Sequence, residues 1–374
     1  VGYFVNTTAG AITVTLPASP SAGDVVAVSD YAGTADTNNI TIGRNGSNIN
    51  GAAADLIIAG INSAITLVYV DGTQGWKATD TSSLSDVALQ PAYITATGGT
   101  ITTVCTDYKV HTFTGPGTFT VSTLGNPAGG PNSVDYMVGA GGGGGGWCIG
   151  GGGGAGGIRA SSGTASGCYS AGPIAACVSA LPVSVQGYSI VVGAGGGGAT
   201  GEPFPTNATS GGVSTFSSIT SAGGGFGGTY GRSGQPGGSG GGAGGWTSNP
   251  DTPGSSGGSG NTPPVSPSQG NNGGSRPIND FQSSGGGGGG ATAVGTTSVT
   301  SPTRTGVAPG GAGNTTVISG TPATYGTGGN GQGDANPTPA PAAANSSGGG
   351  TGAGASTGAN GGSGIVIIRY KFQN

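Results

Sequence analysis

The sequence predicts an all-β protein: a small N-terminal β domain, then a β-framed glycine-rich domain with bundled polyglycine II helices and essentially no α-helix. Three observations lead to this prediction. Short runs rich in Val, Ile and Thr alternate apolar and polar positions, no segment shows helical spacing, and 72 of the 90 glycines lie in residues 141–374. The composition therefore changes partway along a single chain of 374 residues.

Residues 1–82 are predicted to form the first domain, a β-strand module, and residues 83–92 a linker. The pair Asp71-Gly72 is the strongest hairpin signal, because both residues tolerate the backbone conformations of tight turns and good strands flank them. The strands expected in this domain are 2–6, 11–16, 24–29, 39–43, 64–70 and 75–79.

Residues 93–374 are predicted to form the second domain, with strands in 93–138, polyglycine helices and loops in 139–362, and a closing strand in 363–374. The strand ending at Val138 runs directly into six glycines, and the strand ending at Val192 does the same. The apolar closing strand requires a sheet partner, and we expect it to pair with 134–138 and 189–192.

The glycine blocks have two interpretations. Glycine-rich segments are often disordered, because glycine loses more conformational freedom on ordering than other residues. The strands that bracket these blocks favour an ordered alternative, in which extended three-fold helices hydrogen-bond to their neighbours through the backbone. Collagen is excluded because the glycines occur in blocks such as 141–146 and 285–290, not at every third position.

The segments between glycine blocks, such as 226–246 and 247–284, contain aromatic and small polar residues, Phe226 among them. Such residues on a rigid support are typical of recognition loops, although single rings can also cover the ends of the bundle. Trp147, between two glycine blocks, is expected to pack. The candidate receptor-contact residues are Tyr169, Phe204, Tyr230, Trp246, Phe281 and Tyr325.

The charged residues argue against catalysis and nucleic-acid binding. The chain has a net charge of −4, one His, one Glu and no cluster of Lys and Arg. Acid–base catalysis and metal sites need convergent titratable groups, and nucleic-acid grooves need basic tracks. We therefore expect no enzyme activity, catalytic residue, metal, cofactor or nucleic-acid partner. An alternating strand explains His111 without a ligand.

Four cysteines, Cys105, Cys148, Cys168 and Cys177, fit no metal-binding spacing and allow three pairings. Cys168 and Cys177 flank a short loop and are the favoured disulfide. Four free thiols, as in a chain assembled in a reducing compartment, remain the alternative.

Three runs carry a resemblance to a known family: 108–121 (YKVHTFTGPGTFTV), 134–143 (VDYMVGAGGG) and 362–370 (GSGIVIIRY). Together with the many glycine blocks, they resemble the glycine-rich C-terminal domain of tailed-phage fibre proteins. Residues 3–8, 16–24, 43–51 and 70–76 are similar to a module of marine phage tail fibres.

This resemblance implies a virion fibre protein at the virion surface, commonly a homotrimer, that contacts other fibre or tail proteins. Its similarity to T-even-like phage adhesins implies that loops on polyglycine helices bind a host cell-surface receptor, either an outer-membrane protein or a polysaccharide. Long Pro-rich inserts and loops poorer in aromatic residues depart from the adhesin pattern.

Two other functions are weighed against receptor binding. One is a purely structural role, as a head or capsid decoration fibre or as an extracellular filament subunit. The other is a glycoside hydrolase spike, which scattered carboxylates such as Asp251 and Asp280 suggest weakly and which a single Glu disfavours.

Overall fold

The computed structural model describes residues 1–81, 87–167, 169–175, 178–201, 207–245, 254–278, 283–301, 305–335 and 339–373. The chain forms two compact units. The first comprises Val1–Tyr93, Leu124–Pro131 and Gln373, and the second comprises Ile94–Thr123 and Asn132–Phe372 with the last residue. The described residues contain strands and one short 3-10 helix, η2 (Pro173–Ala175), so the protein is all-β as predicted.

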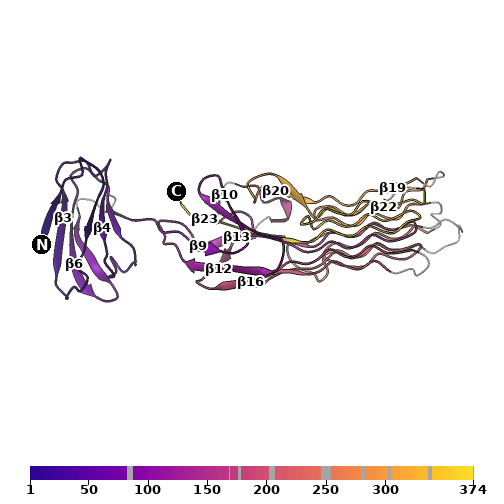
Figure 1. Ribbon diagram of the computed structural model, residues 1–374, viewed down its shortest axis with the longest axis horizontal. Coiled ribbons are helices and arrows are strands. Elements are labelled where there is room, and N and C mark those ends of the chain that lie inside the picture. The colour runs from indigo at the N-terminus through magenta and orange to yellow at the C-terminus, as the bar shows by residue number, and fades with distance from the viewer. Residues whose placement is uncertain are drawn as a thin grey trace. The chain divides into compact units, whose positions relative to one another are not determined.

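The first unit is a sandwich of two four-stranded sheets (Figure 1). Apolar and polar residues alternate along these strands, and the apolar side chains point inward. The resulting core includes Leu16, Ile40, Leu67 and the fully buried Trp76. One sheet has the order β1 (Gly2–Val5), β3 (Val25–Asp30), β6 (Ala64–Asp71), β7 (Gly75–Thr81). The other has the order β2 (Ile12–Thr15), β4 (Ile40–Gly43), β5 (Leu56–Ile58), β8 (Val87–Leu89).

Two strands of this unit differ from the sequence prediction. β5 was not expected, and β8 lies within the segment predicted as a linker, where it pairs antiparallel with β5. Both strands are only three residues long, which leaves little alternation for a sequence pattern to reveal. The hairpin at Asp71 is present, and the Asp71 carboxylate accepts the backbone N–H groups of Thr73 and Gln74.

The second unit begins with two sheets that pack face to face around an aromatic core (Figure 1). Phe119 and Phe216 lie edge to face, with ring centroids 6.0 Å apart. The first sheet contains, in order, β10 (Thr100–Val104), β11 (Tyr108–Phe113), β23 (Ile365–Lys371), β13 (Ser133–Gly139) and β14 (Ile158–Ala160), with β15 (Leu181–Pro182) also on β13. The second contains β18 (Ile219–Ser221), β17 (Ser214–Phe216), β16 (Gly187–Val191), β12 (Gly117–Thr123) and β9 (Thr95–Thr97).

The closing strand β23 lies in the middle of the first sheet and is buried on both faces. It pairs with β13, as predicted, placing Val138 opposite Val366. The expected pairing with 189–192 is wrong. The other neighbour of β23 is β11, while β16 belongs to the opposite sheet between β12 and β17. Alternating strands of similar composition fit either sheet, and only the three-dimensional arrangement distinguishes them.

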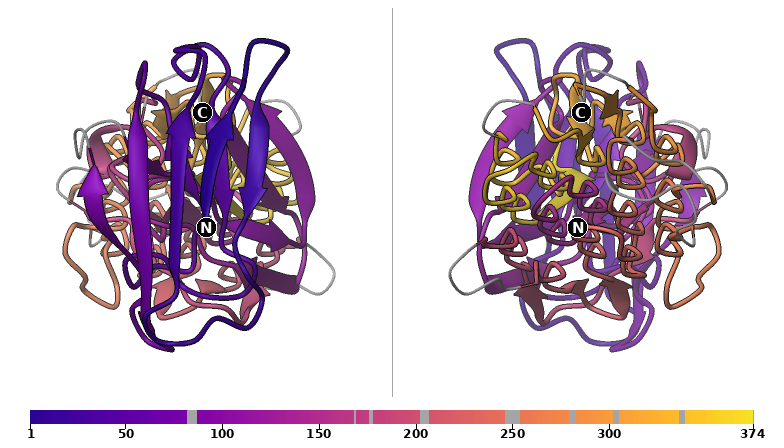
Figure 2. Two further views of the ribbon diagram at one scale, coloured as in Figure 1. Left: turned by 90° about the vertical axis from the view of Figure 1, so that its left-hand side faces the viewer. Right: turned by 90° about the vertical axis from the view of Figure 1, so that its right-hand side faces the viewer.

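Beyond the strands, the chain continues into a bundle of extended segments, here called the lattice, which Figure 2 shows end-on as coils packed side by side. Residues 141–146 show the hydrogen-bonding rule. The N–H groups of Gly141 and Gly144 reach Gly212 and Thr209 on one neighbour. The N–H groups of 142 and 145 donate to the carbonyls of 362 and 359 on a second neighbour. Those of 143 and 146 donate to the carbonyls of 154 and 151 on a third. Each neighbour therefore accepts a hydrogen bond from every third residue of this segment, as a helix of three residues per turn requires.

The carbonyl groups of the same segment accept bonds from three further neighbours. The carbonyls of Gly141 and Gly144 accept from the N–H groups of Gly224 and Gly227. The carbonyls of 142 and 145 accept from 196 and 199, and those of 143 and 146 accept from 350 and 353. The segment thus has six hydrogen-bonded neighbours. The three that receive its N–H groups run antiparallel to it, and the three that donate to its carbonyls run parallel. Backbone hydrogen bonds therefore supply the order that a hydrophobic core supplies elsewhere.

Glycine is needed inside the lattice because segments approach too closely for a side chain. A Cβ on Gly144 would overlap the carbonyl of Gly197. Conformational freedom is not the reason, since glycines 141–146 are absent from the positive-φ residues of the chain.

The lattice also includes segments that composition presents as loops. In the predicted loop 247–284, Gly258 donates to Gly241 and Gly274 donates to Gly287, so the described residues of this segment join the lattice. The burial pattern of residues 191–200 shows where the lattice tolerates residues other than glycine. Positions 193, 196 and 199 are buried, whereas 194, 197 and 200 are exposed, so one residue in three can carry any side chain.

Candidate functional site

Figure 1 shows that the lattice ends in a group of turns at the end away from the two packed sheets. We call residues 147–149 and 229–232, together with Gly245 and Gly354, the lattice tip. Backbone bonds join them. Tyr230 N–H donates to the Trp147 carbonyl at 3.3 Å, Gly245 N–H donates to the Ile149 carbonyl at 2.8 Å, and Ile149 N–H donates to the Gly354 carbonyl at 2.8 Å. Backbone hydrogen bonds therefore join these turns, which are distant in sequence, at one end of the support. Ile149, Gly245 and Gly354 are buried there, whereas Trp147 and Tyr230 are half-buried and Arg232 is exposed.

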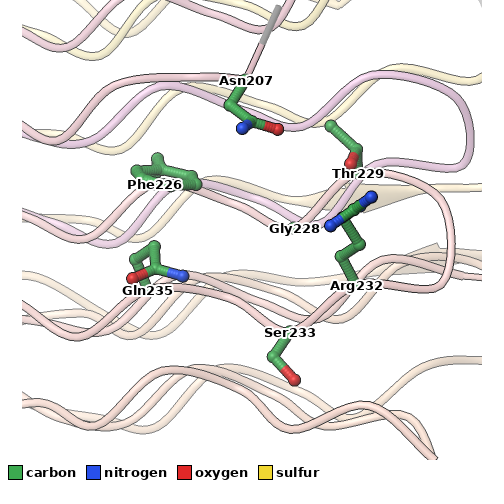
Figure 3. Close-up of a pocket in the computed structure, with 7 residues that line it drawn as sticks. All are labelled: Asn207, Phe226, Gly228, Thr229, Arg232, Ser233 and Gln235. Carbon is green, nitrogen blue, oxygen red and sulfur yellow. The ribbon is translucent and has the colours of Figure 1, made fainter.

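A groove of about 290 Å³ opens beside the lattice tip (Figure 3). We call it the side groove. Three lattice segments contribute to it, and two of its residues, Thr229 and Arg232, also belong to the tip. Its lining residues are Asn207, Phe226, Gly228, Thr229, Arg232, Ser233 and Gln235.

The backbone of the side groove is held by the lattice. The Phe226 carbonyl accepts the Gln235 N–H at 3.0 Å, and Arg232 N–H donates to the Thr229 carbonyl at 2.8 Å. The Arg232 carbonyl in turn accepts from Gly244 at 2.8 Å. The positions of Phe226, Arg232 and Gln235 are therefore set before any ligand arrives, which lowers the entropic cost of binding.

The side chains of the groove combine one half-buried ring with several exposed polar groups. Phe226 is half-buried, while Asn207, Arg232, Ser233 and Gln235 are exposed. Amide, hydroxyl and guanidinium groups supply donors and acceptors, but none of the seven lining residues is an acid, a histidine or a cysteine. This arrangement suits recognition of a polar ligand, and none of these seven residues is suited to act as a general base.

Two predicted contact residues instead pack inside the second unit. Tyr169 and Tyr325 lie against an apolar cluster that includes Ile158, Ile318 and Ile367. Burial raises the pKa of both tyrosines, and for Tyr169 the nearby Asp135 carboxylate raises it further. Both rings are half-buried and contribute to the packing of this cluster, which is separate from the aromatic core between the two sheets.

Tyr230 is the predicted contact residue that lies at the lattice tip, where it is half-buried. Phe204, Trp246 and Phe281, the disulfide candidates Cys168 and Cys177, and the carboxylates Asp251 and Asp280 lie outside the described residues. The two described cysteines, Cys105 and Cys148, are free thiols.

The sequence placed Phe226, Arg232, Ser233 and Gln235 in a segment typical of recognition loops, but none of them was among the candidate contact residues. A signal was available in the spacing of Arg232 and Gln235, which are three residues apart. In a helix of three residues per turn, such residues share a face, and both are exposed here. The signal could be used only after this segment was recognised as part of the lattice.

Within the described ranges, no three His, Cys, Asp or Glu side chains gather as they would around a metal ion. The same residues include no helix with the length and apolar character needed to cross a membrane.

The fold and lattice define an all-β glycine-rich protein, and comparison with known families agrees. The model of a glycine-rich domain matches residues 112–371, which is more than half of the chain. The chain therefore belongs to this glycine-rich domain family. A search of curated proteins found no match.

Proposed function

We propose that this protein is a virion fibre protein that attaches to a host cell surface through the lattice tip and the side groove. The observation that carries the proposal is the set of bonds joining Tyr230 to Trp147, Gly245 to Ile149 and Ile149 to Gly354. They gather turns from distant parts of the sequence at one end of a support that does not depend on those turns' side chains. Such a division between scaffold and variable surface is typical of recognition proteins.

The phage-fibre part of the proposal rests on the resemblance of residues 108–121, 134–143 and 362–370 to phage fibre proteins. Location at the virion surface, a homotrimeric state and contacts with other fibre or tail proteins belong to the same proposal. Binding without chemical turnover is supported by the seven described residues of the groove lining, none of which is an acid or a histidine.

Attachment is tested by binding of the fluorescently labelled full chain to candidate bacterial host strains, measured by flow cytometry. The informative variant is Tyr230→Ser at the tip. The matched control is Tyr31→Ser, which removes a tyrosine that is 68% exposed in the first unit. We expect the tip variant to lose binding and the control to keep it. Equal binding by both variants would remove the tip from the proposal.

The fibre assignment needs a separate experiment. Antibody fragments against the second unit are expected to label the free end of an appendage on virus particles and to block adsorption. Labelling along the particle body without any effect on adsorption would favour the structural alternative, a decoration fibre or filament subunit. Mass measurement in solution distinguishes a closed trimer from an open-ended polymer.

A further inference from the structure

We infer that the side groove binds an acidic saccharide, with Arg232 pairing its carboxylate or phosphate and Phe226 contacting a face of the sugar ring. This inference rests on the proposed function and deepens it by naming the ligand class. The groove is pre-formed, adjoins the lattice tip and presents complementary groups from three neighbouring lattice segments (Figure 3).

Arg232 supplies the charge. Its side chain is exposed, and among the described residues no ion pair or hydrogen bond occupies its guanidinium group. An arginine fork binds carboxylate or phosphate oxygens in pairs, which gives both attraction and orientation. Its backbone is fixed on both sides, by the bond to the Thr229 carbonyl and by the bond from Gly244. The backbone that carries this charge is therefore held at a defined place beside the groove.

Phe226 and the polar residues supply the remaining contacts. The ring is half-buried between Gly225 and Gly227, so part of it faces the groove. A saccharide has apolar C–H faces that suit an aromatic ring and hydroxyl groups that suit amides. Asn207 and Gln235 each provide an acceptor and two donors, and Ser233 and Thr229 add hydroxyl groups.

Size and charge select among ligand classes. A volume of about 290 Å³ lies at the small end of ligand pockets and suits one or two sugar rings. A single-stranded nucleic acid also combines phosphates with stacking faces, but its binding needs a positive track along the backbone. Arg232 is the one basic residue of the groove lining, and the whole chain carries a net charge of −4.

The test uses the full chain and four defined probes, with binding followed by NMR titration. The disaccharide of galacturonic acid carries carboxylates, and its methyl ester is the neutral match. Glucose 6-phosphate and glucose form the corresponding phosphate pair. We expect at least one acidic probe to bind at least about tenfold more tightly than its neutral match, and the pair that responds identifies the source of the anion.

Variants then assign the binding to the groove. Arg232→Gln is expected to weaken acidic binding about tenfold to hundredfold, because hydrogen bonds to charged groups contribute that much. Arg232→Lys keeps the charge without the fork and should recover only part of the affinity. Phe226→Leu should weaken acidic and neutral probes alike, by about twofold to tenfold. Arg159→Gln, a charge loss on β14 outside the groove, should change nothing.

Three results would overturn the inference: no binding of either acidic probe, equal affinity for acid and neutral match, or unchanged acidic binding in Arg232→Gln. A thymidine decamer serves as a fifth probe, and if it binds more tightly than either acidic sugar, the inference is overturned in favour of a nucleic acid. Each variant is first checked for an unchanged melting temperature. Loss of cell binding in Tyr230→Ser is a separate readout, so the proposed function can stand when this inference fails.

Discussion

Asp135 and Arg369 lie directly opposite each other on β13 and β23, and both side chains are fully buried. The Asp135 carboxylate accepts hydrogen bonds from the Ser161 and Ser166 hydroxyls, and from the backbone N–H groups of Ala165 and Ser166.

Arg369 donates from Nη1 to the Ile318 carbonyl, whereas its Nε and Nη2 atoms have no hydrogen-bond partner. The rings of Tyr108 and Tyr169 lie 4.7 and 4.9 Å from the guanidinium carbon. The buried guanidinium group thus lies against aromatic faces and lacks a full set of hydrogen bonds, and Asp135 occupies the opposed position on the neighbouring strand.

Asp135→Asn should therefore destabilise the second unit strongly. The substitution removes the charge opposite Arg369 and turns an amide group toward donors that need an acceptor. We expect a loss of about 3 kcal/mol in the free energy of unfolding, because several of the four buried hydrogen bonds to the carboxylate lose their acceptor. Urea unfolding, followed by circular dichroism, measures this free energy. Asp107→Asn, at a half-exposed position of the same unit, is the control, and an equal effect there would contradict this account.

Neighbouring glycines in one lattice segment should respond oppositely to alanine. A Cβ on Gly196 would overlap the carbonyl of Thr209, whereas a Cβ on Gly197 has only ordinary contact with the Thr209 hydroxyl at 3.6 Å. Gly196→Ala should cost about 3 kcal/mol, because the segments must move apart and lose hydrogen bonds. Gly197→Ala should be neutral or stabilising by up to about 1 kcal/mol. Thermal unfolding compares the two, and equal stabilities would argue against a close-packed lattice.

Stability should fall in mild acid because of His111, the single histidine of the chain. Its ring is fully buried, with Nδ1 2.7 Å from the Gly98 carbonyl and Nε2 3.2 Å from the Tyr370 hydroxyl. Burial lowers the pKa of His111 below its ordinary 6.5, and the charge of Lys109 lowers it further, while the Gly98 hydrogen bond opposes them. The unfolded chain therefore binds a proton more readily than the folded chain.

It follows that the contribution of His111 is complete above pH 6.5 and is lost as the pH falls toward its folded pKa. The melting temperature of the second unit, measured from pH 8 to pH 5 in steps, should decline over that interval. His111→Phe cannot titrate and should show a flatter profile. A wild-type profile as flat as that of the variant would show that protonation of His111 does not lower the stability of the fold.

Tyr169 should prove to be a packing residue. Its hydroxyl oxygen is buried without a hydrogen-bond partner, so Tyr169→Phe removes an unsatisfied polar atom and keeps the ring over Arg369. We expect unchanged or slightly higher stability, by up to about 1 kcal/mol, and unchanged cell binding. Tyr169→Ala should cost about 3–5 kcal/mol through the cavity it leaves. A loss of cell binding by the phenylalanine variant at full stability would restore Tyr169 as a contact residue.

Features that depend on local pattern were predictable. The alternating runs identified most strands of the first unit and the longer strands β11, β12, β13 and β16 of the second, and the apolar run at 363–374 identified β23 and its pairing with β13. The short strands β14, β17 and β18 were not predicted, because three residues leave little alternation to detect. The second neighbour of β23 was not predictable, because β11 and β16 have the same alternating character. Choosing between them requires knowing which sheet each strand joins.

The candidate site shows the same division. The aromatic content of the inter-glycine segments indicated recognition, but it could not separate Tyr230, at the lattice tip, from Tyr169 and Tyr325, which pack against the apolar cluster. Nor could it reveal that Asn207 and Arg232 line one groove, since they belong to different lattice segments.

Composition and strand pattern are enough to establish an all-β chain whose strands pass into glycine-rich three-fold helices. They do so because strand alternation and glycine blocks are local properties. The tertiary structure alone decides which glycines are indispensable and which side chains meet. The physical reason is that lattice hydrogen bonds join different segments, as Gly141 joins Gly212, so register and exposure exist only once the segments are assembled.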